Sequence, residues 1–298
     1  MVDSLTRSRA KGKGLDDVNL AIQITVFLIM AIVGLDLTRA DFGRLTERPT
    51  LIVVASIAQW TLLPVVAWAV AWILPLPPHI VAGIVLLAAC PAGAISNYYS
   101  FIARADVALS VTLTAISAAV SVVTLPLILA VGFSLMLDHA ARVKVPIGPI
   151  AVQLTVNLLI PVLVGMWLRA RFPEFVTRHQ TAARRLGNVA LVTTVAIFLS
   201  GLGRSVLKDL GVTILWAVVF TIVAAGAGLI VGAALRADRR QLQTLAIEFA
   251  CRNTAITILI GVVVLGRPEL AVFGLVVFLT QMPLVLGANA VANRWYRE

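Results

Sequence analysis

The residues Cys90–Asn97 read CPAGAISN, and they stand near the middle of the apolar run Ile80–Ile102. Such a run can cross a bilayer as a helix, because about 30 Å of hydrocarbon takes roughly 20 helical residues. Proline removes one helical hydrogen bond and glycine loosens the turn, so this stretch predicts a helix that is broken halfway along. Taken alone, the same stretch is also compatible with a simple proline kink.

A second apolar run, Leu242–Leu265, is interrupted in a comparable way. It contains Glu248 and Arg252 within the sequence EFACRNT. Interrupted segments at corresponding positions of two halves of a membrane protein are the best sequence indication of a secondary transporter's binding site. The two interruptions together favour a pair of broken helices over two unrelated kinks.

The composition indicates an all-α integral membrane protein. Of the 298 residues, 60% are apolar and 13% are charged, whereas a soluble domain carries about 25% charged residues. The runs do not alternate between apolar and polar residues as barrel strands do, so we expect helices throughout. The nine expected spans are Val18–Leu37, Thr50–Leu74, Ile80–Ile102, Val107–Leu135, Ile147–Leu168, Leu186–Leu202, Val212–Leu235, Leu242–Leu265 and Leu270–Ala292.

We expect a single transmembrane domain over residues 18–293, with a first half-repeat at 18–135 and a second at 147–293. A basic N-terminal tail, residues 1–17, precedes it, and a short tail, residues 294–298, follows. The apolar run after the N-terminal tail is too long for a signal peptide and has no cleavage site of small residues.

The distribution of Lys and Arg predicts the orientation in the bilayer. The loops after the odd-numbered spans carry 14 of these residues, and the loops on the other side carry five besides the tail. The positive-inside rule then places the C-terminus and the expected loop Arg169–Arg185 in the cytoplasm, which suits a multi-pass protein of the inner (plasma) membrane. Nine spans would put the basic N-terminal tail outside, against the same rule. Either a further helix precedes the first span or the tail crosses unaided.

Several function classes are disfavoured. The basic residues lie in short loops between spans, which argues against nucleic-acid binding. No nucleophile pattern and no phosphate-binding glycine loop is present in the sequence, so we expect neither an enzyme nor an ATP-driven pump.

Glu248 and Arg252 are the most informative pair of residues. A charge in the middle of the membrane costs roughly 2.5–3.5 kcal/mol on insertion scales, so each group needs a partner. Because they are four residues apart, they can meet on one helix face. One interpretation is an ion pair that only fixes helix packing. The other is that Glu248 binds a cation while Arg252 faces an anion or replaces a cation.

Four neutral side chains accompany Glu248 at this depth. Ser96 and Asn97 follow the first interruption, and Ser110 and Thr114 lie four residues apart on the next span. Neutral oxygens and one carboxylate suit a hard monovalent cation such as sodium rather than zinc, which prefers nitrogen or sulfur ligands. The alternative is that these hydroxyls serve only helix packing.

These residues resemble those of the bile acid:sodium symporter family over nearly the whole chain from about Asp16. The stretch from Ser96 and Asn97 to Ala108–Ser110 is the specific part of the resemblance. The supporting matches are Gly34–Leu37, Asp41 and Phe42, Arg48 and Pro49, Ala58 and Gln59 with Pro64, Cys90–Ile95, Ala103–Val107, and Glu248 with Asn253. The resemblance implies an inverted-repeat transporter fold with a panel domain and a core domain, in which the two broken helices cross. Bacterial members commonly have ten spans, and this chain resembles one that lacks the first; animal members resemble a nine-span form with an external N-terminus.

The resemblance also implies ion sites. The first sodium site corresponds to Ser96, Asn97, Ser110, Thr114 and Glu248. The second corresponds to Glu248, the backbone at Phe249 and Cys251, the side chain of Gln59, and a glutamine whose place is taken here by Arg252. A guanidinium group only donates hydrogen bonds and cannot ligate sodium. We hypothesise that Arg252 acts as a tethered cation in this altered site; the competing hypothesis is that it binds a substrate carboxylate.

The substrate site implied by the resemblance lies at the crossing, with Asn253, Ala94 and Ile95, and with Arg252 in the competing form. Ala94 stands where some relatives have threonine. The resulting prediction is a carrier in the lipid bilayer for a small organic anion, bile-acid-like or another carboxylate, with sodium as the coupling ion and no further cofactor. A sodium-independent carrier or exchanger is the first alternative, and an anion-binding membrane receptor is the second.

Overall fold

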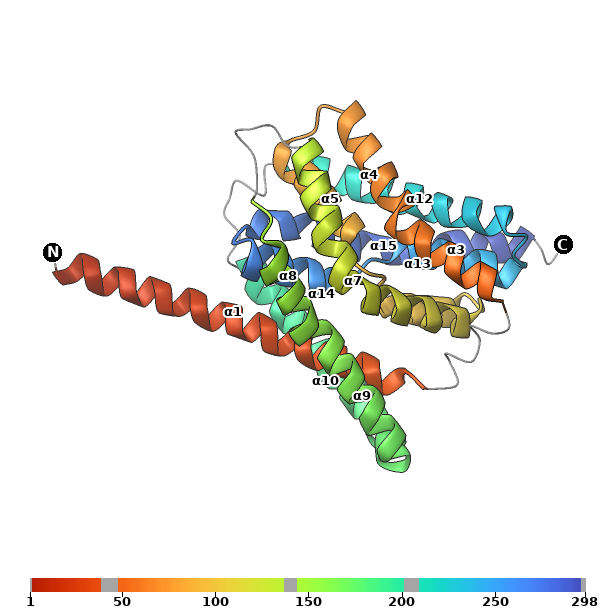
Figure 1. Ribbon diagram of the computed structural model, residues 1–298, viewed down its shortest axis with the longest axis horizontal. Helices are drawn as coiled ribbons and strands as arrows, with labels where there is room; N and C mark the ends of the chain where they lie inside the picture. The colour runs from red at the N-terminus through yellow and green to blue at the C-terminus, as the bar shows by residue number, and fades with distance from the viewer. Residues whose placement is uncertain (1, 39–47, 137–143, 201–208, 296–298) are drawn as a thin grey trace.

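The computed structural model describes residues 2–38, 48–136, 144–200 and 209–295, and the regular elements in these ranges are helices. Two residues of the family resemblance, Asp41 and Phe42, lie outside these ranges, and so does the end of the expected C-terminal tail. The helices of the first half are α1 (Val2–Asp36), α3 (Pro49–Trp60), α4 (Leu62–Ile73), α5 (Pro78–Ala89), α6 (Ile95–Ile102) and α7 (Val107–Met136) (Figure 1). Those of the second half are α8 (Ile147–Leu154), the π-helical turn η2 (Thr155–Leu159), α9 (Ile160–Arg171), α10 (Pro173–Ser200), α12 (Leu210–Ala234), α13 (Arg239–Ala250), α14 (Thr254–Ile258), the π-helical turn η3 (Leu259–Val264) and α15 (Pro268–Trp295).

Within the described ranges, six helical segments are long and apolar enough to cross a membrane, which confirms a multi-pass helical membrane protein. They are Asp17–Asp36 of α1, Pro49–Ile73, Val107–Met136, Ile147–Arg171, Leu210–Ala234 and Pro268–Asn289. The other three expected spans coincide with the interrupted pairs α5–α6 and α13–α14 and with α10. The count of nine spans stays a prediction.

Both predicted interruptions are real breaks. α5 ends at Ala89 and α6 begins at Ile95, so the backbone leaves the helix over the residues that include Pro91 and Gly93. In the second run, α13 ends at Ala250 and α14 begins at Thr254. The proline explains the first break, because its ring cannot continue a helix.

The prediction of a loop over Arg169–Arg185 is wrong, because most of this segment is helical. α9 continues to Arg171 and α10 begins at Pro173, so Phe172 alone separates the two helices. Proline at the first position of α10 favours a helix start there. The charged residues predict a loop before the apolar run, but they lie on the exposed first half of α10 itself.

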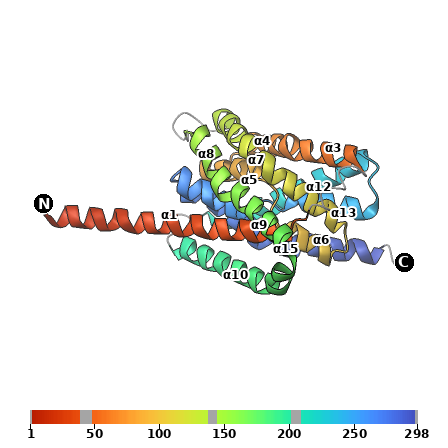
Figure 2. The same cartoon turned by 60° about the horizontal axis from the view of Figure 1, so that its bottom comes forward.

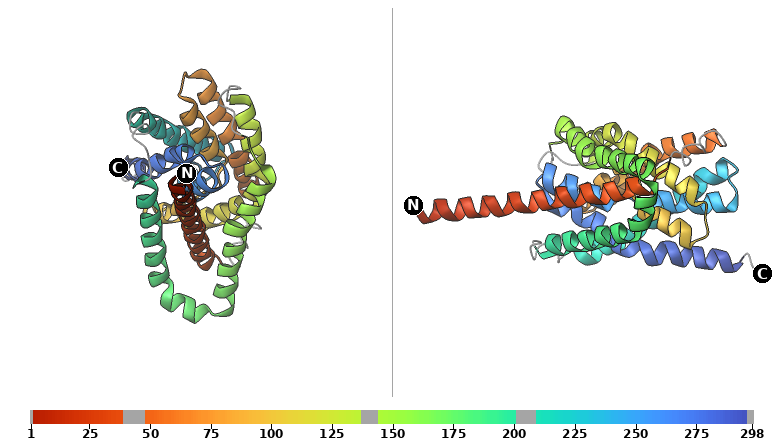
Figure 3. Two further views of the ribbon diagram at one scale, coloured as in Figure 1. Left: turned by 90° about the vertical axis from the view of Figure 1, so that its left-hand side faces the viewer. Right: turned by 90° about the horizontal axis from the view of Figure 1, so that it is seen from below.

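α1 packs against α9 and α10, and these three helices lie along one flank of the molecule (Figures 2 and 3). A Cβ atom added at Gly34 would meet the carbonyl oxygen of Val162, and one added at Gly165 would meet that of Ala31. The backbones of α1 and α9 therefore touch directly, as small residues allow in membranes.

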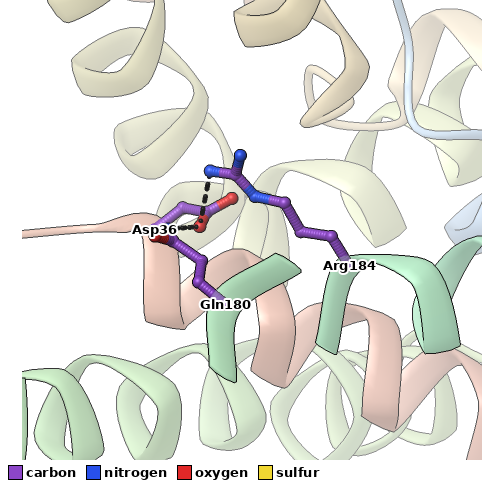
Figure 4. A network of polar contacts seen from close by, with 3 residues as sticks. All are labelled: Asp36, Gln180 and Arg184. Carbon is purple, nitrogen blue, oxygen red and sulfur yellow. Dashed lines mark hydrogen bonds and ion pairs between the residues drawn. The ribbon is translucent and has the colours of Figure 1, made fainter. Parts of the chain in front are cut away.

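A polar contact ties the end of α1 to α10. Gln180 Nε2 donates to Asp36 Oδ1 at 2.6 Å, and Arg184 Nη2 lies 3.0 Å from the same oxygen (Figure 4). Asp36 and Arg184 are partly exposed, so this ion pair contributes at most about 1 kcal/mol. Its main effect is to fix the position of α10 beside the end of α1.

The first prediction concerns the glycine contact. We expect Gly165→Ala to lower the thermal unfolding temperature of the detergent-solubilised protein, because overpacking against a backbone costs about 1–3 kcal/mol. Gly226→Ala on α12 is the matched control, since no atom of the described residues lies within 4 Å of its added Cβ, apart from its own helix backbone and chain neighbours. Equal melting curves for the two variants would contradict the close contact of α1 and α9.

Candidate functional site: the crossing of two broken helices

The two breaks meet in the interior and bond to each other through their backbones. Gly93 N–H donates to Cys251 O, and Asn253 N–H donates to Pro91 O, both at 2.9 Å. These bonds form an antiparallel bridge at Ala92 and Arg252. A Cβ atom at position 93 would lie 3.1 Å from Arg252 O, so the absence of a side chain at Gly93 permits this close approach.

Other backbone groups of the first break are satisfied by side chains. Ala92 N–H donates to Ser117 Oγ of α7 at 3.0 Å. Arg252 Nη2 donates to the carbonyl oxygen of Cys90. Because a buried polar group without a partner costs free energy comparable to a lost hydrogen bond, these contacts allow an irregular backbone to exist at this depth.

The Glu248 cluster, defined as Ser96, Asn97, Ser110, Thr114 and Glu248, brings together every predicted member of the first ion site. Ser96 Oγ and Ser110 Oγ donate to Glu248 Oε1, the first at 2.5 Å. Thr114 Oγ1 lies 3.2 Å and 3.1 Å from the two carboxylate oxygens. The carboxylate is fully buried, so it depends on these donors for stabilisation.

Asn97 completes the cluster through its side-chain oxygen. Asn97 Oδ1 lies 2.8 Å from Ser110 Oγ and 3.4 Å from Thr114 Oγ1, within hydrogen-bonding distance of both hydroxyl groups. Hydroxyl groups rotate and keep two lone pairs each, so the same side chains can turn their oxygens toward a cation. The arrangement is a set of oxygen ligands around one carboxylate, which suits a hard cation.

Arg252 lies beside Gln59, where the altered second site was predicted. Its Nη1 donates to Gln59 Oε1 of α3 at 3.0 Å, and the residue is 2% exposed. Phe249 and Cys251 are also buried here, and the Cys251 carbonyl oxygen accepts the bond from Gly93. The guanidinium therefore occupies the space between the two breaks and α3.

The expectation that Glu248 and Arg252 share one helix face is wrong. α13 ends at Ala250, and the chain at Arg252 is extended across the first break. Among the residues that the structure describes, no ion pair or hydrogen bond joins Glu248 to Arg252. The four-residue spacing predicts a shared face only while the helix continues, and here it stops between the two charges.

Of the predicted substrate residues, Asn253 lies on the side of the crossing that faces α1. Asn253 Oδ1 accepts from Ile256 N–H and so caps α14, while its Nδ2 lies 3.9 Å from Met30 Sδ of α1. Ala94 and Ile95, at the start of α6, are partly buried. The structure thus places Asn253 between the crossing and the flank formed by α1, α9 and α10.

A cavity of about 270 Å³ lies between the flank and α7. Its lining side chains are aliphatic and come from the end of α1, from α7, and from η2 and α9. They are Leu37, Ala115, Ile116, Ala118, Ala119, Val120, Leu158, Leu159, Val162, Leu163 and Met166. None of the residues predicted to bind substrate is part of this lining.

Ser117 is the site residue that the sequence analysis missed. It follows Ser110 and Thr114 on the same face of α7, and Ser121 comes one turn later. This stripe of hydroxyls extends beyond the cluster and was the available signal. The role of Ser117 could not be predicted from the sequence, because its partner is a backbone N–H group of the first break, which only the folded structure brings close.

These features define a multi-pass helical membrane protein in which two broken helices cross beside a buried carboxylate. The sequence model described as "Sodium Bile acid symporter family" matches residues 23–209, and the chain belongs to this family. The family is one of symporters rather than enzymes. The matched range includes four members of the Glu248 cluster and ends before Glu248 itself.

Individual relatives carry names that agree with this family. A protein of Bacillus subtilis, "Uncharacterized sodium-dependent transporter YocS", is 31% identical over 62% of this chain and 57% of its own length. A probable chloroplastic sodium/metabolite cotransporter of Oryza sativa is 28% identical over 90% of this chain and 62% of its own. The hepatic sodium/bile acid cotransporter of Rattus norvegicus is 26% identical over 64% and 53%, respectively. The chain thus matches less than two thirds of the length of each of these relatives.

The second prediction tests the crossing. We expect Ser117→Ala to lower the thermal unfolding temperature, because it leaves the Ala92 N–H group buried without an acceptor, at a cost of about 1–3 kcal/mol. Ser121→Ala is the control: it is equally buried on the same helix, but within the described ranges its Oγ bonds to Ala118 O of its own helix and to no other group. If Ser121→Ala lowers the unfolding temperature as much as Ser117→Ala or more, Ser117 does not stabilise the crossing through Ala92 N–H.

Proposed function

We propose that this chain is a secondary active transporter that moves an organic anion across the cytoplasmic membrane by alternating access, coupled to one sodium ion. The single observation that carries the proposal is the Glu248 cluster, a buried carboxylate surrounded by oxygen-bearing side chains from α6 and α7. Membership of the symporter family supports the coupling to sodium. The ion would be held by the cluster, and its charge would balance that of Glu248.

The position of Arg252 supports the hypothesis of a tethered cation. Its guanidinium contacts Gln59, which the family resemblance assigns to the second sodium site. A permanent positive charge there excludes a second sodium ion by repulsion and by its lack of lone pairs. We therefore expect each transport cycle to carry one sodium ion and one anion.

Charge balance gives this stoichiometry a physical advantage. In the empty carrier, the charges of Glu248 and Arg252 cancel, and in the carrier loaded with one sodium ion and one monovalent anion they cancel again. A carrier with only one of the two ligands has an unbalanced charge in the membrane, which is costly. The empty and fully loaded forms are therefore the ones that we expect to change conformation, and this couples the two ligands.

The apolar cavity supports an amphipathic substrate. Its aliphatic lining can receive the hydrocarbon body of a bile-acid-like anion, whereas a small polar carboxylate would gain little from it. Asn253 faces the same flank and would bind the polar end, with the N-terminus of α6 as a further attraction for negative charge. Ala94 and Ile95 would lie beside that end.

For the architecture, we propose the inverted-repeat arrangement with half-repeats at residues 18–135 and 147–293. Each half contains one broken helix followed by one long helix, α7 or α15, which supports this assignment. The flank of α1, α9 and α10 would form the panel domain, and the remaining helices the core domain. The arginines near the α9–α10 corner and after α12 favour a cytoplasmic position for that side and for the C-terminus.

The third prediction concerns sodium. We expect sodium chloride to raise the thermal unfolding temperature of the purified protein, and a concentration of 100 Kd corresponds to about 2.7 kcal/mol of stabilisation. Glu248→Gln should lose this effect, because an amide keeps the shape and removes the charge. Potassium chloride at the same ionic strength is the control; equal stabilisation by potassium would refute a sodium site.

The fourth prediction concerns Arg252. In proteoliposomes, we expect anion uptake by the natural chain to need a sodium gradient and to move no net charge. Arg252→Gln restores a neutral ligand at the second site, so net charge moved per anion should rise from zero to one. A glutamine amide can still donate to the Cys90 carbonyl, which protects the fold.

The outcomes for Arg252→Gln separate the alternatives. If the stoichiometry stays the same and KM for the anion rises, Arg252 binds the substrate carboxylate instead. Uptake that proceeds equally without sodium would favour the sodium-independent carrier or exchanger, and a ligand that binds but never enters the vesicle lumen would favour a receptor.

A further inference from the structure

Buried polar side chains form a continuous line from the Glu248 cluster toward one end of the core helices. On α13 they are Gln241, Thr244 and Glu248, whose spacing of three and four residues places them on one face. We define the polar seam by these residues together with those that face them on α7 and α6. Ser96 of α6 and Ser110 and Thr114 of α7 contact Glu248, and Asp106, the residue before α7, contacts Thr244. Ser100 lies one turn after Ser96 on α6.

The seam is closed by direct contacts between α13 and the start of α7. Asp106 N–H donates to Thr244 Oγ1 at 2.9 Å, and Thr244 Oγ1 lies 3.0 Å from Asp106 O. Thr244 is fully buried and stands one turn before Glu248. Asp106 is partly exposed, so the seam reaches solvent at this residue.

The distance from the ion cluster to this end is short. Gln241 and Glu248 lie two turns apart on α13, which is about 10 Å along a helix. Gln241 Oε1 accepts from Arg48 Nη1 at 3.4 Å, and Arg240 Nε donates to Arg104 O at 3.2 Å. Two arginine side chains thus lie across the outer end of the seam.

Ser100 indicates that the hydroxyls of the seam do more than link neighbouring helices by hydrogen bonds. Its hydroxyl is fully buried and has no hydrogen-bond partner in the described part of the chain. Packing alone would be served better by alanine, because a buried hydroxyl without a partner is unfavourable. It lies one helical turn beyond Ser96, on the side of the solvent-facing end.

We propose that the polar seam is the passage by which a monovalent cation enters and leaves the Glu248 cluster, with Thr244 as the intermediate oxygen ligand. This deepens the proposed function and depends on its sodium site. A cation that leaves Glu248 meets the Thr244 hydroxyl and then the backbone and carboxylate oxygens of Asp106, all suitable ligands for a hard cation. The seam opens when Thr244 and Asp106 part and the arginines at the end turn aside.

The test separates the rate of sodium exchange from its equilibrium. Thr244→Val replaces the hydroxyl by a methyl group of similar size. It removes the intermediate ligand and also the acceptor of the Asp106 N–H group, whereas the residues of the Glu248 cluster stay unchanged. For this variant of the 298-residue chain, we expect an unchanged sodium concentration for half-maximal thermal stabilisation. Release of radioactive sodium from the purified protein, measured after dilution, should be at least ten-fold slower.

Three further variants make the result specific. Thr244→Ser keeps the hydroxyl and should release sodium at the natural rate, whereas Ser100→Ala should slow release in the same direction as Thr244→Val. Thr221→Val on α12 is the control, a buried threonine outside the seam whose hydroxyl bonds to Ala217 O.

Each outcome decides between the two proposals. Natural or faster release in Thr244→Val overturns the passage, because faster release would show that Thr244 only holds the seam closed. Natural release in Ser100→Ala overturns it as well, and so does slow release in Thr244→Ser, which would show a packing effect. If the natural chain shows no sodium-dependent stabilisation at all, the sodium site of the proposed function fails instead.

Discussion

Two backbone hydrogen bonds, Gly93 to Cys251 and Asn253 to Pro91, are the contacts on which the rest of the site depends. In hydrocarbon, no water can bond to the polar groups that a broken helix releases, so these groups must find partners inside the protein. Each break satisfies the other, and neither could exist at this depth alone. The paired interruptions of the sequence are thus a single structural unit formed by residues far apart in the chain.

The crossing also decides where charge can be placed. Because α13 ends before the second charge, Glu248 points toward α6 and α7 while Arg252 turns toward α3 and the Cys90 carbonyl. Two ionisable groups that are close in sequence are thereby separated into different surroundings, one rich in hydroxyl oxygens and one with an amide and a carbonyl oxygen. Under the proposed function, this separation would leave the carboxylate available to an ion while the guanidinium takes the place of a second one.

The two breaks were predicted from Pro91 and Gly93 and from the paired interruptions. The cost of charge inside an apolar run predicted a polar site around Glu248. The closeness of Arg252 to Gln59 was predicted only from the resemblance to the symporter family. Prediction from the sequence failed where a local rule was extended past the end of a helix, as for the shared face of Glu248 and Arg252. It also failed where charge was interpreted as a loop, since α10 begins at Pro173. The role of Ser117 could not be predicted, because its partner depends on the angle at which two distant segments cross. The same holds for the aliphatic cavity, whose walls come from three separate stretches of the chain.

The glycine contact between α1 and α9 limits how the molecule can deform. At Gly34 and Gly165 backbone lies against backbone, so at these two points no side chain can change rotamer to accommodate sliding of α1 along α9. The boundary between this flank and α7 can deform more easily, because the apolar side chains around the cavity can exchange neighbours without breaking a hydrogen bond. A relative movement of the two parts would therefore be accommodated at this apolar boundary, and the Glu248 cluster, which includes other residues of α7, would keep its contacts.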